Sequence, residues 1–520
     1  MDGTTTGPAG AGSEARNFLG HPRGLVVLFF AEMWERFSYY GMKALLVFYL
    51  TQHFLFADDP AFAIIGAYTS LVYLTPLLGG YMADRWLGYR RAVILGGVLI
   101  MLGHIGMAFE GQAASYTADG TLIRDGNSLQ IFYLALALII VGTGLLKPNI
   151  STIVGALYEP GDARRDGGFT IYYMGINIGA LAAPLLCGWL GHTYGWSYGF
   201  GAAAVGMAAG LIVFVLGRSW LDGRGEPHDP EGLRRPMLAG LKAGHVITLA
   251  TVASVLPLWW LVQNSHVVGT LLIGVAAVSI GGVAYYAVRN LEHVDRDRIL
   301  AILVLTGLAT LFFAFFEQTG TSISLFAERA VDLTLMGMAV APAQIQAINP
   351  MFIILCAPLF ALGWVWLARA NAEPNIPVKF ALGLVQIGIG FFMFIVGIEL
   401  AQEGHRVGFA WLVLGYLFHT TGELCLSPVG LSAVTKLAPP RMTSLMMGIW
   451  FLSSAFANYA AALIAMTASV DEPPGTDVPV AVALPVYEAT FSSIAWVGVG
   501  AGLAALLVSP LIKRLMHGVR

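Results

Sequence analysis

The sequence predicts an all-α membrane protein that crosses the bilayer fourteen times. Of its 520 residues, 57% are apolar and 11% are charged, and the mean hydropathy is +0.72. Soluble domains carry about 25% charged residues. Apolar runs of about 20 residues, the length that spans a bilayer, recur along the whole chain. Lys and Arg collect in alternate connections between these runs, as they do on the cytoplasmic side of membrane proteins.

The apolar runs fall into groups of six, two and six. The first predicted spans are 23–53, 61–84, 89–110, 129–157, 169–190 and 196–217. A pair follows at 245–265 and 267–289, and the last spans are 298–327, 342–369, 377–402, 407–437, 442–467 and 486–516. The predicted organisation is a tail (1–22), a six-helix bundle (23–217), a linker with an inserted hairpin (218–297) and a second six-helix bundle (298–520).

The basic residues indicate the orientation of the chain. With both termini in the cytoplasm, Arg124, Arg329 and Arg406 fall outside, and Arg36, Lys43 and Lys147 fall within spans. The rest of the 28 Lys and Arg residues lie at the cytoplasmic side. An even number of spans follows, and we expect a location in the cell inner membrane. Residues 1–22 are polar, and the first apolar run carries charges at its middle, so we expect a retained first span, with no cleaved signal peptide.

The connection between spans two and three marks the fold. Residues 79–91, GGYMADRWLGYRR, resemble the major facilitator signature at this place, with glycines for a tight turn and close helix packing. Two six-helix bundles around a midplane site are the arrangement of major facilitator proteins. The inserted pair has no charged residue within its spans, and this composition predicts a packing hairpin.

Several function classes are excluded or disfavoured. The three cysteines lie in apolar spans and lack Cys-x-x-Cys spacing, so we expect no disulfide framework and no metal site, and no cofactor is indicated. No basic patch indicates nucleic acid. Nothing resembles a nucleophile with its base or a phosphate-binding glycine loop, so we expect no enzyme. A receptor without transport is disfavoured because charges within spans are costly.

The first span carries a charged stripe. At about 100° per residue, one face of the helix collects most of these positions, with Glu35 at its margin. The stripe consists of Glu32, Glu35, Arg36, Tyr39, Tyr40 and Lys43. Ionisable groups at membrane depth cost about 2.5–3.5 kcal/mol each on insertion scales, so this face predicts a polar pathway between helices.

The charges within all of the spans, taken together, define a chemical problem. The acids are Glu32, Glu35, Glu317 and Glu423, and the bases are Arg36, Lys43 and Lys147. Full ionisation leaves one uncompensated carboxylate, and burial favours its protonated form, so it is a plausible proton carrier. Acids on one side and bases on the other suit a zwitterion such as a short peptide.

Three further motifs carry a family resemblance. Residues 32–41, EMWERFSYYG, resemble the ExxERFxYYG motif of the proton-dependent oligopeptide transporter family. Phe169, Tyr173, Asn177 and Gly179 match its FxxxYxxxNxG signature, and residues 422–432, GELCLSPVGLS, resemble its GELxLSPxGLS segment. The central pair of spans resembles that of bacterial members. The resemblance implies proton-coupled import of di- and tripeptides by alternating access, by a protein that works as a monomer within membrane lipid.

The resemblance also implies roles for individual residues. The implied proton-coupling set is Glu32, Glu35, Arg36, Lys147 and Glu317. The substrate carboxylate would bind Arg36, Lys43 and Lys147, and its amine Glu423, Asn177 and Asn349. Side-chain pockets would be lined by Tyr39, Tyr40, Tyr73 and Trp450, and Ser454 would be a further substrate-binding residue. An ion pair between Lys43 and Glu317 would close the outer face, and one between Lys147 and Glu423 the inner face.

The sequence departs from the family at two positions, and alternatives stay open. Lys43 stands where many members carry Arg and lacks the bidentate fork, which bears on its bridge to Glu317. Gly66 stands where mammalian members use His, so proton coupling is expected to rest on carboxylates. The same fold with nitrate, another small anion or an amino-acid conjugate as cargo remains the alternative. Each charged residue also has a structural interpretation, as a static ion pair or an interhelical contact.

Overall fold

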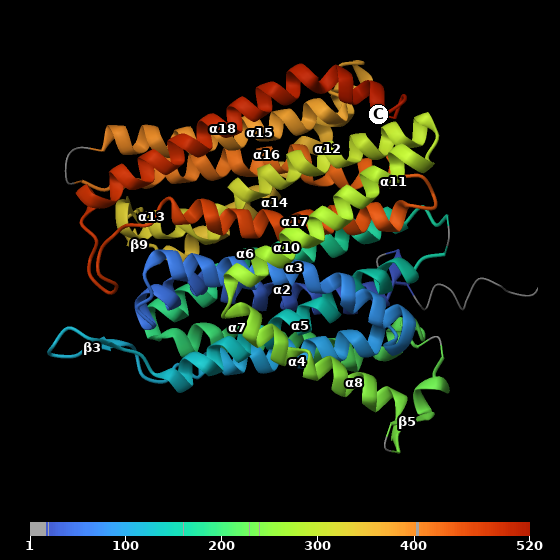
Figure 1. The fold of residues 1–520 in the computed structure, drawn as a ribbon, viewed down its shortest axis with the longest axis horizontal. Helices are drawn as coiled ribbons and strands as arrows, with labels where there is room; N and C mark the ends of the chain where they lie inside the picture. The colour runs from blue at the N-terminus through green and yellow to red at the C-terminus, as the bar shows by residue number, and fades with distance from the viewer. Residues whose placement is uncertain are drawn as a thin grey trace, which may run out of the picture.

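The computed structural model describes residues 17–18, 20–159, 161–227, 229–238, 240–401 and 405–519. Most of the predicted tail, with Arg16, lies outside these residues, as does Arg520. The described part of the tail is a hairpin of β1 (Asn17–Phe18) and β2 (His21–Pro22), in which Asn17 pairs with Pro22. Helices form nearly all of the remaining structure (Figure 1).

The first six predicted spans are formed by helices that pack on one another. They are α2 (Gly24–Phe48) with the π turn η1 (Tyr49–His53), α3 (Asp58–Met82) with η2 (Ala83–Leu87), α4 (Tyr89–Ala108), α5 (Gly126–Ala156), α6 (Arg165–Tyr194) and α7 (Trp196–Leu216). The helix α2 packs on α6 and α7, and α5 packs on α3 and α4. We refer to α2–α7 as the first bundle.

The signature loop between α3 and α4 is fastened to the linker. Gly88 has φ +76°, and a Cβ there would lie 2.5 Å from the backbone nitrogen of Pro227, so only glycine fits this turn. The Arg90 backbone N–H donates to the Gly225 carbonyl at 2.8 Å. The Arg90 side chain also pairs with Glu226. The start of the linker therefore packs against the first bundle.

The last six predicted spans pack together as a second bundle, α12–α18. Its elements are α12 (His293–Phe316), η6 (Glu317–Gly320), α13 (Ser322–Ala330), η7 (Pro342–Ala347), α14 (Ile348–Arg369), α15 (Ile376–Leu400), α16 (Phe409–Leu437), α17 (Thr443–Met466) and α18 (Val480–Leu515). The predicted span 298–327 is interrupted here, because the 3₁₀ turn η6 and Thr321, at φ −134° and ψ −101°, separate α12 from α13.

The predicted pair of spans at 245–289 forms a kinked hairpin. Its limbs are α8 (Ala243–Ala253) with α9 (Val255–Val262), and α10 (Ser265–Ala276) with η5 (Ala277–Gly281) and α11 (Gly282–Asn290). The first limb breaks at Ser254 because Pro257 has no N–H to donate to the Ala253 carbonyl. The hairpin packs α9 on α5, α10 on α3 and α17, and α11 on α12, so it touches both bundles (Figure 1).

Short elements connect the helices. They are η3 (Gly217–Leu221), η4 (Gly232–Arg234) and four small sheets, which pair β3 (Ser115–Tyr116) with β4 (Leu122–Ile123), β5 (Pro236–Leu238) with β6 (Leu241–Lys242), β7 (Val331–Asp332) with β10 (Val407–Gly408), and β8 (Thr334–Leu335) with β9 (Met338–Ala339). The β7–β10 pair is parallel, and the others are antiparallel.

Within the described residues, 13 helices are long and apolar enough to cross a membrane. The charged helix α2, which is not among them, continues through η1 to His53 in the same layer of helices, and with it the predicted fourteen spans are present (Figure 1). Two names are used for the ends of the molecule. The basic end holds Arg85, Arg90 and Arg369, and the opposite end, called the far end, holds Asp58 and Arg329. Between the bundles, α3 packs on α17, and α6 on α14 and η7.

Candidate functional site

Three charged side chains meet in α2. The Arg36 Nε atom lies 2.5 Å from Glu35 Oε2 and 3.0 Å from Glu32 Oε1. Each of these side chains is at most 5% exposed. Glu35, expected at the margin of the stripe, makes the shorter contact. One guanidinium faces two carboxylates, so the cluster is neutral overall only when one carboxylate holds a proton.

Much of this cluster's hydrogen-bonding capacity is unused. Within the described residues, Glu32 Oε2, Glu35 Oε1 and Arg36 Nη2 are buried without a hydrogen-bond partner. A buried unsatisfied polar atom costs about 1–3 kcal/mol, so the arrangement is expensive for stability alone. The hydroxyl of Tyr68 is also unpartnered among the described residues, and Tyr172 lies beside Glu32. The sequence motifs do not single out these two tyrosines, because their contribution arises from helix packing.

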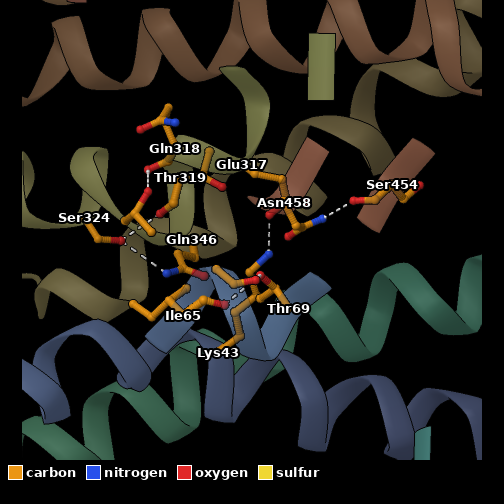
Figure 2. A network of polar contacts seen from close by, with 12 residues as sticks. Lys43, Ile65, Thr69, Glu317, Gln318, Thr319, Ser324, Gln346, Ser454 and Asn458 are labelled. Atoms are coloured by element: carbon orange, nitrogen blue, oxygen red, sulfur yellow. Dashed lines mark hydrogen bonds and ion pairs between the residues drawn. The ribbon is translucent and has the colours of Figure 1, made fainter. Parts of the chain in front are cut away.

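An ion pair joins the two bundles. The Lys43 Nζ atom of α2 donates to Glu317 Oε2 at 2.6 Å, and the side chains are 10% and 12% exposed (Figure 2). Gly320 follows in the same 3₁₀ turn, and a Cβ there would lie 3.1 Å from Lys43 Cε. The absence of a side chain at Gly320 therefore leaves room for the lysine stem. The pair implied by the family resemblance is formed with lysine in the place of arginine.

Polar side chains hold the broken turn of η6 in place. Gln318 donates to the Ala461 carbonyl of α17 at 2.9 Å, and its amide oxygen accepts from Ser322 at 2.6 Å. Ser324 donates to the Thr319 carbonyl at 2.7 Å and accepts from Gln346 at 3.2 Å (Figure 2). These hydrogen bonds therefore fix the position of the turn that carries Glu317.

Lys147 and Glu423 are not paired with each other. The Lys147 ammonium of α5 lies 4.3 Å from the centre of the Tyr73 ring. Glu423 of α16 accepts a hydrogen bond from Asn349 Nδ2 at 3.1 Å, and the same amide group donates to Thr420 at 3.0 Å. The implied inner ion pair is therefore absent from this conformation of the described residues, because each charge has a neutral partner on its own bundle.

Only some of the predicted aromatic and amide residues lie beside the charged residues. Tyr39 and Tyr40 make an edge-to-face contact at 5.3 Å, and the Arg36 guanidinium lies 5.5 Å from the Tyr39 ring centre. Trp450 is buried against Phe380 and Gly430 of the second bundle. Asn177 donates to the Tyr173 carbonyl of its own helix. Ser454 accepts, through its backbone carbonyl, from Asn458 (Figure 2).

The charged set converges around Tyr40. The Tyr40 side chain lies close enough to charged residues of both bundles to interact with them electrostatically. These residues are Arg36, Lys43, Glu317 and Glu423. Lys147 interacts likewise with Arg36, Glu35, Glu32 and Glu317. Residues that lie up to about 390 positions apart in the sequence are thus gathered in one region between the bundles. Within the described residues, Asn177 and Ser454 make hydrogen bonds only within their own helices.

A second set of contacts closes the far end. Asp58 at the start of α3 pairs with Arg329 of α13, through two bonds of 2.6 and 2.7 Å, and also accepts from the Val470 N–H at 3.1 Å. Further polar contacts between the bundles at this end are Gln52–Glu328, Asp59–Ser469, Tyr116–Pro474 and Leu185–Gln344. The structure is therefore a conformation closed at the far end. The sequence placed Arg329 only in an outside loop and did not pair it.

Comparison with known proteins connects this geometry to a family. The family model described as "POT family" matches residues 90–477. The peptide transporter YePEPT of Yersinia enterocolitica is 38% identical over 496 residues, covering 91% of this chain and 92% of that protein. A di-/tripeptide transporter of Lactococcus lactis subsp. cremoris is 35% identical, covering 97% of this chain and 98% of that protein.

Solved structures agree over the same length. The crystal structure of a peptide transporter POT in complex with sulfate has 39% identity and a TM-score of 0.79, and covers 97% of both chains. A glutamate-to-glutamine variant of a peptide transporter POT, in complex with alafosfalin, has 39% identity and a TM-score of 0.78 with the same coverage. The similarity thus extends over helices, motifs and connections alike, and this chain belongs to the POT family.

Proposed function

We propose that this protein imports di- and tripeptides together with protons by alternating access. The observation that carries the proposal is the distribution of buried charge between the bundles. The first bundle holds all three bases, Arg36, Lys43 and Lys147, with the acids Glu32 and Glu35, and the second bundle holds only the acids Glu317 and Glu423 of this set. The names of the relatives support peptides as the cargo. We propose a transporter and not an enzyme, because the relatives are named as transporters.

The substrate would bind through its two termini. Lys147 is held by an aromatic ring and Glu423 by an amide, so neither charge is neutralised by an ion pair within the described residues. A peptide carboxylate would join Arg36, Lys43 and Lys147, and a peptide amine would join Glu423 with Asn177 and Asn349. Tyr39, Tyr40, Tyr73 and Trp450 would contact the side chains of the peptide, since aromatic faces accept varied shapes. Ser454 would be a further substrate-binding residue.

Protons would act on the two carboxylate groups. Glu32 and Glu35 share one guanidinium, which makes one of them the spare acid. Protonation of Glu317 would remove its attraction for Lys43 and release the ion pair between the bundles. After the far end opens, Lys147 and Glu423 would form the inner pair. Proton binding and opening of the far end would therefore be coupled.

The protein is a multi-span membrane transporter of a bacterial type, and its finer placement is part of the proposal. We place the basic end in the cytoplasm, with both termini there and the far end outside the inner membrane. The bundles over 23–217 and 298–520 would move as units around the charged site. Protons and membrane lipid would be the further partners, and the unit of transport would be the monomer.

Uptake into proteoliposomes tests the function. Labelled dialanine is offered under an imposed gradient that is alkaline and negative inside, with unlabelled tripeptide, nitrate or a protonophore added. Accumulation that is blocked by tripeptide and protonophore but unaffected by nitrate supports the proposal. Gradient-driven uptake of nitrate with no uptake of dialanine would contradict it and favour an anion as cargo. No specific observation favours that alternative.

A further inference from the structure

A group of metal-ligating side chains lies at the basic end, apart from the charged site. His293 is the first residue of α12, Asp297 lies one turn later, and His517 follows α18. His293 Nδ1 and His517 Nε2 approach the same atom, Asp297 Oδ2, at 3.3 and 3.0 Å. These three atoms all lie within 4.8 Å of one another. Residues separated by more than 200 positions in the chain therefore aim their donor atoms at one point.

The surrounding contacts orient these groups. Asp297 is the buried member, with its side chain 9% exposed, and its other oxygen, Oδ1, accepts from Arg296 Nε at 3.2 Å and Nη2 at 3.0 Å. Oδ2 is left to face the imidazoles. The turn after α18 is fixed by buried Met516 and by a hydrogen bond from the His517 N–H to the Arg514 carbonyl at 3.2 Å. Such outer contacts commonly hold metal ligands in position.

The spacing suits a tetrahedral ion. A zinc ion with ligand bonds of about 2.0–2.1 Å places neighbouring ligand atoms about 3.3 Å apart. The two distances to Asp297 Oδ2, 3.3 and 3.0 Å, match this edge length. The His293 side chain is 70% exposed and that of His517 is 29% exposed, so an ion can enter from water and keep water as its fourth ligand.

We propose that His293, Asp297 and His517 bind a divalent transition-metal ion of the zinc class. The donor set is two imidazole nitrogens and one carboxylate oxygen, which suits zinc and its neighbours. Calcium takes six to eight oxygen ligands and is not matched by these residues. The site is independent of the peptide site, so the two proposals stand or fall separately.

The bound ion would brace the second bundle. It would join the end of α18 to the start of α12, where the inserted hairpin enters that bundle. Both ligand-bearing helices belong to the same bundle and also pack on each other. The ion would therefore raise thermal stability and leave the contacts between the bundles unchanged.

Zinc titration of the intact protein tests this proposal. The protein is purified in detergent without a histidine tag and titrated with zinc chloride by calorimetry. We expect one zinc ion per chain, and affinity at least about tenfold lower in His293→Ala, His517→Ala and Asp297→Asn. His266→Ala and His405→Ala remove exposed histidines elsewhere and would bind zinc like the unmodified protein.

Cobalt adds a second measurement. Cobalt(II) in a tetrahedral site with nitrogen ligands absorbs visible light strongly, and this band should appear in the unmodified protein and vanish in the ligand variants. Because His293 is largely exposed, its replacement leaves the core intact. Absence of stoichiometric zinc binding in the unmodified protein, or equal binding in His293→Ala and His517→Ala, would overturn the proposal.

Discussion

Asp58 and Arg329 hold the far end of the two bundles together through a bidentate ion pair, with bonds of 2.6 and 2.7 Å. Asp58 is 5% exposed, and the Arg329 side chain is 14% exposed. Planar guanidinium–carboxylate pairs are the strong form of this interaction. Because the partners come from α3 and α13, the pair must separate whenever the far end opens.

Loss of the Asp58 charge should shift the protein toward a state open at the far end. Hydrogen bonds to charged groups contribute about 1.5–3 kcal/mol, so Asp58→Asn should raise the open fraction about tenfold or more. Spin labels on cysteines placed at Tyr194 and Leu400, at the far ends of α6 and α15, would show a longer distance population. Asp477→Asn is the matched control, since Asp477 is exposed in the far-end loop between α17 and α18 and makes no side-chain contact within the described residues. Identical distance distributions in both variants would refute a role for the pair.

Neutralising Glu317 should uncouple transport from the proton gradient. Glu317→Gln keeps the shape of the side chain but removes its exchange between a proton and Lys43. We expect gradient-driven uptake of dialanine to fall to background, while counterflow exchange of peptide persists. Glu373→Gln is the control, because Glu373 pairs with Lys379 near the surface. Full gradient-driven uptake by Glu317→Gln would contradict the assignment.

Replacing Glu423 should distinguish peptide from anion as the cargo. In Glu423→Gln the hydrogen bond with Asn349 can persist, but the charge that would hold a peptide amine is gone. We expect KM for dialanine to rise at least about tenfold, as removal of one charge-assisted contact implies. Glu399→Gln, at the exposed end of α15, should leave KM unchanged. An unaltered KM in Glu423→Gln would argue for a substrate without an amine.

The adjacent glycines of the signature loop should differ in their tolerance of alanine. A Cβ at Gly79 would lie 2.0 Å from the Gly144 carbonyl oxygen of α5, whereas one at Gly80 would meet Pro148 at an ordinary 3.7 Å. Gly79→Ala should therefore lower stability by about 1–3 kcal/mol, and Gly80→Ala should stay close to the unmodified protein. Thermal unfolding in detergent measures both, and equal melting temperatures would show that α3 and α5 can separate at no cost.

Much of the architecture was predictable because a membrane-spanning helix is identified by a local run of apolar residues. The apolar run 23–53 became α2 with η1, and 407–437 became α16, with ends within two residues. The break at Glu317 was not predicted, because the apolar run 298–327 continues past it without a proline. Pro257 could have indicated the kink in α8–α9, since proline interrupts a helix wherever it lies.

The candidate site was predictable only in part. Ionisable residues in apolar runs identify Lys43 and Glu317 without any knowledge of packing. Which charges pair depends on the conformation, so the absence of the Lys147–Glu423 pair could not be read from the sequence. The Asp58–Arg329 pair lies at span ends, where charged residues are ordinary and carry no signal.

The fastening of the linker to the signature loop limits how the two halves can move. Gly88 against Pro227, and Arg90 against Gly225 and Glu226, make the start of the linker part of the first bundle. The part of the chain that is free to move between the two bundles is therefore much shorter than the whole segment between α7 and α12. Any change in their relative angle must be absorbed after Pro227, and the inserted hairpin, which touches both bundles, must slide or flex in every transport cycle.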